Sequence, residues 1–108
     1  MTQKNTLQQE EKIIVHVDKE IADLIPGFLE NRRKDIKTMG EAVTQGDFET
    51  IQSLGHSMKG AGGSYGFDAI TDIGTTLEQA AIAKNYAEIK KLVQDLSAYL
   101  DRVEAVYE

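Results

Sequence analysis

The sequence predicts an all-α protein, namely an up-down-up-down antiparallel four-helix bundle with a short extra N-terminal helical or extended segment. Apolar residues recur at three- and four-residue steps along most of the chain, which is the period of an amphipathic helix. The chain contains one proline, and its β-branched residues do not form repeated alternating runs bounded by turn residues. Four helical stretches with connections of a few residues favour antiparallel neighbours. A length of 108 residues is typical of one domain.

The N-terminal segment is the least regular part of the chain. We expect residues 1–14 to be a polar tail and residues 15–108 to form the bundle domain. The stretch Ile13–Val17 (IIVHV) is either an extended arm or the start of the first helix, and its β-branched residues favour the arm.

The first long helical region follows Asp18, a predicted N-cap. Its apolar stripe comprises Ile21, Leu24, Ile25, Phe28, Leu29, Ile36, Met39 and Val43. Pro26 lies inside this pattern, and because proline lacks an N–H it should either kink the helix or open a new one from its first turn. Gly46 should end the segment, and Asp47 should cap the next helix.

Three further helices are predicted downstream. The first runs from Phe48 to about Ser64, and a turn at Gly66 leads to another that begins near Asp68. Asn85, with Glu88 three residues later, resembles a capping box for the last helix. The predicted apolar residues of these helices are Phe48, Ile51, Leu54, Met58, Ala61 and Tyr65, then Ile70, Ile73, Leu77, Ala80 and Ala81, then Ile89, Val93, Leu96, Leu100, Val103 and Tyr107.

Composition narrows the possible partners. A formal net charge of −6 gives no basic field to attract nucleic acid or anionic lipid. No apolar run approaches the roughly 20 residues that span a bilayer, and the polar N-terminus does not resemble a signal peptide. We therefore expect a cytoplasmic protein that contacts neither nucleic acid nor membrane. The absence of cysteine excludes disulfides and thiol chemistry.

His56 is the principal candidate for chemistry because the helical period places it opposite the apolar face of its helix. Gln52, Lys59 and Gly63 fall around it on the same projection, and Gly60 lies one turn further on. His56 should therefore point into solvent, whereas a core histidine would be buried. An exposed histidine without any role is the plain alternative.

The glycines near His56 sharpen this interpretation. The segment GHSMKGAGGSYG has five glycines in twelve residues, although each glycine in a helix costs about 1 kcal/mol relative to alanine. At Gly60 and Gly63 the missing side chains would let another protein approach the imidazole. Gly55 and Gly62 project toward the edge of the core face, where close helix packing is the better explanation.

Attack of a histidine on phosphorus needs few protein groups. A neutral imidazole has a free nitrogen lone pair and can attack phosphorus. Lys59, three residues further along the helix, would place a positive charge near the phosphoryl oxygens.

His56-Ser-Met-Lys59-Gly60, with Gly66 ten residues after the histidine, resembles the signature of the histidine-phosphotransfer (HPt) domain family. The downstream residues Ile70, Ile73, Gly74, Leu77, Glu78 and Ala81 also resemble the family's next helix. The resemblance implies a four-helix bundle in which His56 is the phosphoacceptor, Lys59 lies beside the phosphate and Gly60 leaves room. Glu78 aligns with a position where many relatives carry a polar residue that orients the imidazole.

The resemblance also implies partners: a response-regulator receiver domain, which supplies the magnesium, and a histidine kinase. The chain has no nucleotide-binding motif, so we expect a phosphoryl carrier without a cofactor of its own, not an enzyme. We expect a monomer, either stand-alone or part of a larger protein. The expected docking surface comprises Gln52, Ser53, Lys59, Gly63, Asp72 and Thr75.

Two other functions remain open at this stage. One is the phosphoacceptor domain of a chemotaxis-type histidine kinase, which an ATP-binding domain would phosphorylate directly. The other is a non-catalytic helical adaptor, in which His56 has no chemical role.

Overall fold

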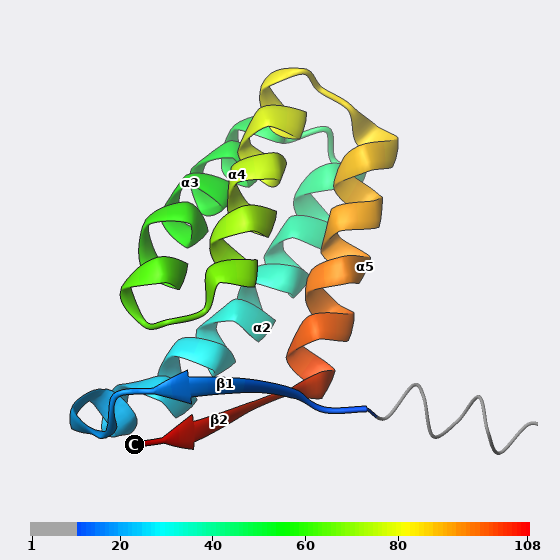
Figure 1. Ribbon diagram of the computed structural model, residues 1–108. Coiled ribbons are helices and arrows are strands. Elements are labelled where there is room, and N and C mark those ends of the chain that lie inside the picture. The colour runs from blue at the N-terminus through cyan, green and yellow to red at the C-terminus, as the bar shows by residue number, and fades with distance from the viewer. Residues whose placement is uncertain (1–10) are drawn as a thin grey trace, which may run out of the picture.

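The computed structural model describes residues 11–108, and Figure 1 shows its elements in chain order. These are β1 (Ile13–Val17), the 3-10 helix η1 (Lys19–Leu24), α2 (Ile25–Thr44), α3 (Phe48–Ser64), α4 (Asp68–Ile82), α5 (Tyr86–Arg102) and β2 (Val103–Tyr107). Helices α2 to α5 run up, down, up and down beside one another, as the sequence predicts. Each helix contacts its two neighbours around the bundle, so α5 also packs against α2.

Short turns hold consecutive helices antiparallel. Three residues separate each helix from the next. Gly46 and Gly66 have positive φ angles of 71° and 91°, a conformation that glycine adopts without steric cost. Asp47 caps α3 by accepting from the N–H of Thr50, and Asn85 caps α5 by accepting from the N–H of Glu88. Both caps agree with the sequence prediction.

The first helical region is divided at its proline. Asp18 accepts from the N–H of Glu20 at the start of η1, and Pro26 lies in the first turn of α2. Pro26 therefore opens a new helix, one of its two predicted effects. The predicted apolar stripe is wrong at Leu24, a residue that is 53% exposed. Leu24 belongs to η1, and a 3-10 helix has about three residues per turn, so its side chains do not follow the 3.6-residue spacing of the predicted stripe.

The core lies between the four helices and matches most of the predicted apolar stripes. The fully covered large side chains are Ile25, Met39, Ile51, Met58, Phe67, Ile70, Leu77, Ile89 and Leu96. Phe67 is in the turn between α3 and α4, and its ring stacks on that of Phe28 from α2. The core therefore fixes the ends of both α3 and α4, the helices that carry the candidate site.

The last helix was predicted to continue to Tyr107, and this is wrong. It ends at Arg102, and Val103–Tyr107 form β2 in parallel with β1, with Ile13 opposite Val103 and Val17 opposite Tyr107. The VEAVY stretch suits a strand, and it becomes one because β1, from the other end of the chain, lies beside it (Figure 1).

The extended arm that the sequence favours for Ile13–Val17 is confirmed as β1. This strand includes Ile13 and Ile14, which belong to the expected tail of residues 1–14. Residues 1–10 of that tail lie outside the described part of the chain. Within the described part, no helix combines the length and the hydropathy needed to cross a bilayer.

Candidate functional site

His56 lies in the middle of α3, and its side chain is 69% exposed. The opposite face of the helix carries Ile51 and Met58, both completely buried. The predicted solvent-facing orientation of His56 is therefore confirmed, and it follows from the helical period of the core residues.

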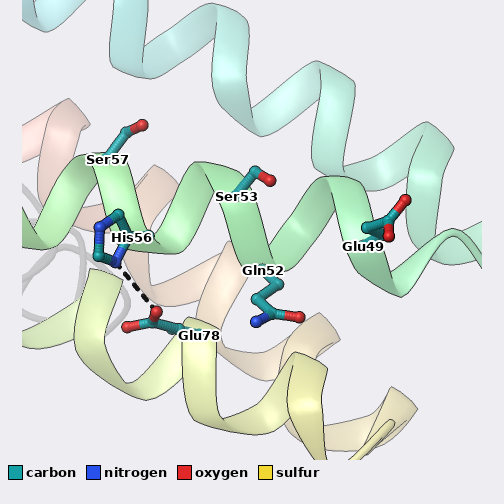
Figure 2. Close-up of a pocket in the computed structure, with 6 residues that line it drawn as sticks. All are labelled: Glu49, Gln52, Ser53, His56, Ser57 and Glu78. Carbon is teal, nitrogen blue, oxygen red and sulfur yellow. Dashed lines mark hydrogen bonds and ion pairs between the residues drawn. The ribbon is translucent and has the colours of Figure 1, made fainter.

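Glu78 of α4 lies between His56 and Lys59 and contacts both. Its Oε2 is 3.0 Å from Nδ1 of His56, and its Oε1 is 3.2 Å from Nζ of Lys59. Figure 2 shows the carboxylate directly across the α3–α4 contact from the imidazole. The Glu78 side chain is only 14% exposed. Its Oε1 is covered from solvent, and the Lys59 contact there is an ion pair without the alignment of a hydrogen bond.

The charge of Glu78 determines the tautomer of His56. The Lys59 ammonium, and then the His56 hydrogen bond, lower the pKa of Glu78, although partial burial opposes them. Glu78 is therefore ionised at neutral pH and can only accept hydrogen bonds. It follows that Nδ1 of His56 donates a proton to Glu78 and that, in the neutral ring, Nε2 carries the free lone pair. The nitrogen with the free lone pair is thus the one that faces away from Glu78.

The lowered pKa of Glu78 predicts a pH dependence of stability. Its folded-state pKa lies below the ordinary value of 4.5, so its stabilising contribution is complete above that pH and is lost as the pH falls through the folded-state value. Between about pH 6 and about pH 3, the wild type should lose more resistance to urea than Glu78→Gln, which cannot titrate. Urea midpoints measured for both proteins at both pH values test this. Equal losses would contradict it.

Glycines bring α3 and α4 close enough for these contacts. A Cβ added to Gly55 would lie 2.8 Å from the backbone nitrogen of Glu78 and the carbonyl oxygen of Gly74. One added to Gly74 would lie 2.7 Å from the backbone nitrogen of Lys59, and one added to Gly62 would lie 2.6 Å from that of Thr71. The close packing predicted for Gly55 and Gly62 is confirmed, and Gly74 completes it from α4.

Gly60 and Gly63 differ in their surroundings, although both were expected to leave space near His56. A Cβ on Gly60 would meet nothing within 4 Å, whereas one on Gly63 would lie 3.5 Å from the hydroxyl of Thr71. The N–H of Gly63 also donates to that hydroxyl at 2.7 Å. Gly60 thus faces open space one turn after His56, and Gly63 faces the start of α4.

A depression of about 510 Å³ adjoins His56 and is lined by Glu49, Gln52, Ser53, His56, Ser57 and Glu78 (Figure 2). Gln52 therefore lies beside His56, where the helical projection put it. Figure 2 shows Ser53 and Ser57 on the side of α3 away from Glu78. Sequence reasoning missed Ser57 and Glu49, because an exposed polar residue in a helix has no local signal that separates it from its neighbours.

The hydroxyls of Ser53 and Ser57 differ from other exposed helical hydroxyls. In the described residues, neither forms a hydrogen bond within the protein. By contrast, the exposed hydroxyls that donate to the carbonyl four residues earlier are those of Thr38, Thr44, Ser64, Thr75 and Thr76. The side of α3 next to His56 therefore keeps two hydroxyl donors available.

Comparison with known protein families identifies the chain. A family model described as the Hpt domain matches residues 23–106. The chain belongs to the Hpt domain family. Searches of curated proteins and of solved structures found no match. Hpt domains are helical phosphocarrier modules, not kinases, and take part in histidine phosphotransfer with receiver domains and kinases in two-component phosphorelays.

This Hpt domain has a second histidine in a different setting. His16 is in β1, and its Nδ1 is 2.7 Å from Oε2 of Glu108, with both side chains largely exposed. In the described residues, no lysine side chain forms an ion pair with either residue, and Lys19 contacts Glu108 only through its backbone N–H, which donates to the Glu108 carbonyl at 3.1 Å. Only His56 is combined with a lysine and a covered carboxylate.

Proposed function

We propose that this Hpt domain is a phosphorelay intermediate in which Nε2 of His56 accepts a phosphoryl group and exchanges it with an aspartate of a response-regulator receiver domain. The observation that carries the proposal is the contact of Glu78 with both His56 and Lys59. It combines an oriented imidazole with a cation on the next turn of the same helix face.

The transfer step requires no proton exchange at the imidazole. The lone pair of Nε2 attacks the phosphorus of the aspartyl phosphate, and the P–O bond breaks so that its electron pair leaves with the aspartate carboxylate. The ring becomes an imidazolium that retains its Nδ1 proton. Glu78, at 3.0 Å from Nδ1, stabilises that positive charge as a buried carboxylate does in a catalytic triad.

Lys59 is proposed to stabilise the phosphoryl oxygens. Its side chain is 43% exposed, so its ammonium has room to turn from Glu78 toward a group on Nε2. The magnesium that assists the reaction would be held by the receiver domain, whose acidic pocket also contains the aspartate.

The receiver is proposed to dock over α3 around His56. Gly60 leaves open space one turn after the histidine, and the hydroxyls of Ser53 and Ser57 are available to polar groups of a partner. The corresponding hydroxyl of Thr75 on α4 is already bonded to the carbonyl of Thr71. Of the residues expected at the interface, Ser53 therefore has more support than Thr75.

The experiment that tests the function is incubation of the protein with a phosphorylated receiver domain and magnesium. The expected product carries acid-labile, alkali-stable phosphate, which mass spectrometry should map to His56 and ³¹P NMR should assign to Nε2. Phosphate on Nδ1 would contradict the tautomer set by Glu78. Phosphate on a serine or threonine would contradict the proposed chemistry altogether.

Replacing Lys59 with glutamine should slow phosphate uptake by about ten- to a hundredfold, because removing one group that stabilises transition-state charge has an effect of at least this order. The measurement is the rate at saturating phosphorylated receiver. Lys37→Gln is the matched control, since Lys37 is exposed on α2 and the substitution removes the same charge. Equal rates for the two variants would exclude a role for Lys59 at the phosphoryl group.

A further inference from the structure

One side chain of α4 enters the hydrogen-bond ladder of α3. The hydroxyl of Thr71 accepts from the N–H of Gly63 at 2.7 Å and donates to the carbonyl of Lys59 at 3.1 Å. In a regular α-helix these two backbone groups, four residues apart, bond to each other. Thr71 therefore bridges the donor and acceptor of one helical turn, and that turn begins at the lysine of the candidate site.

Gly62 makes the bridge possible. A Cβ at Gly62 would lie 2.6 Å from both the backbone nitrogen and the hydroxyl of Thr71, a distance that side-chain atoms do not tolerate. The exposed threonines Thr75 and Thr76 bond only to carbonyls of α4 itself. Among the described threonines of α4, Thr71 alone bonds to α3.

The bridge lies on the same line of contact as Glu78. Thr71, Gly74 and Glu78 are separated by three and four residues and so share one side of α4. Gly74 packs against the backbone of Lys59, and Glu78 reaches His56 and Lys59. The hydrogen bond between His56 and Glu78 measures 3.0 Å, and a displacement of the two helices that lengthens it by about 1 Å would take it beyond hydrogen-bond range.

We infer that Thr71 is a positioning residue for phosphoryl transfer, whose hydroxyl fastens the Lys59 turn of α3 to α4 and so holds Lys59 and His56 against Glu78. The inference rests on the proposed function of His56. Thr71 is half-buried between the helices, so it acts through Lys59 and Glu78 and does not touch the phosphoryl group itself.

The test compares Thr71→Val, which keeps the shape but loses the hydroxyl, with Thr71→Ser, which keeps the hydroxyl. Thr76→Val is the matched control, because the hydroxyl of Thr76 bonds only within α4. In Thr71→Val we expect the rate at saturating phosphorylated receiver to fall about tenfold, since small misplacements of reacting groups have large kinetic effects. The receiver concentration at half-saturation should stay the same. Thr71→Ser and Thr76→Val should keep the wild-type rate.

A second readout does not depend on phosphate transfer. Carboxyl ¹³C shifts should show the pKa of Glu78 rising in Thr71→Val, because the Lys59 contact that lowers it is loosened. Thr71→Ala replaces the valine variant if the latter does not fold. A wild-type rate and an unchanged Glu78 titration in the folded variant would overturn the inference, even with lower thermal stability. If the wild type itself takes up no phosphate, the proposed function fails, and the Glu78 titration still decides whether the bridge positions Lys59.

Discussion

His56→Gln should take up no phosphate from a phosphorylated receiver domain and should keep the fold of the wild type. Glutamine has no nucleophilic nitrogen, so the loss should be complete and not a change in rate. The fold should persist because the imidazole is 69% exposed and, within the described residues, hydrogen-bonds only to Glu78. The measurement is acid-labile, alkali-stable label on both proteins, with circular dichroism to establish equal helicity.

His16→Gln is the matched control, because it removes the other histidine, which pairs with Glu108 at the β1–β2 ribbon, and should leave labelling unchanged. Label on His56→Gln would overturn the assignment of the acceptor. A wild type that takes label from an ATP-dependent kinase domain and from no receiver would favour the chemotaxis-type alternative. A folded wild type that takes no label from any donor, while still binding a partner, would favour the adaptor.

The parts of the site that lie within one helix could be predicted from the sequence. His56, Lys59 and Gly60 are related by the helical period, so a projection suffices to place the histidine in solvent and the lysine beside it. Glu78 is different. It meets these residues only because α3 and α4 pack closely, and no local pattern gives that distance. Its position came from the family resemblance, and its contact with both partners came from the structure.

The same distinction separates the correct and incorrect parts of the fold prediction. Asp47 and Asn85 act on neighbouring backbone groups, so the starts of α3 and α5 follow from the sequence, and Pro26 opens α2, which is one of its two predicted effects. The end of α5 does not. Val103 and Tyr107 continue the apolar spacing of that helix, yet pairing with β1 from the opposite end of the chain draws them into a strand. Thr71 was missed for the same reason, because both of its partners are on another helix.

Gly74→Ala should destabilise the bundle, even though alanine is the better helix former. An added Cβ would lie 2.7 Å from the carbonyl oxygen of Gly55, the backbone nitrogen of Lys59 and the Cβ of Met58. Two of these atoms belong to the backbone, so relief requires α3 and α4 to move apart. Overpacking of this kind costs about 3 kcal/mol, and the gain in helix propensity returns about 1 kcal/mol. We expect a net loss of about 2 kcal/mol, which should lower Tm by roughly 10 °C in a domain of this size.

Gly60→Ala is the matched control, because it is the same substitution in a helix but at a position where the added Cβ would meet nothing within 4 Å. It should raise stability by up to about 1 kcal/mol, so thermal melts should place the two variants on opposite sides of the wild type. Equal stability of Gly74→Ala and wild type would mean that the helices separate without cost and that close packing does not hold Glu78 in place.

The two variants should also differ in transfer from a phosphorylated receiver. Gly74→Ala should slow transfer at saturation because Glu78 moves away from His56. Gly60→Ala should raise the receiver concentration at half-saturation, because its methyl group occupies the space that we assign to the partner.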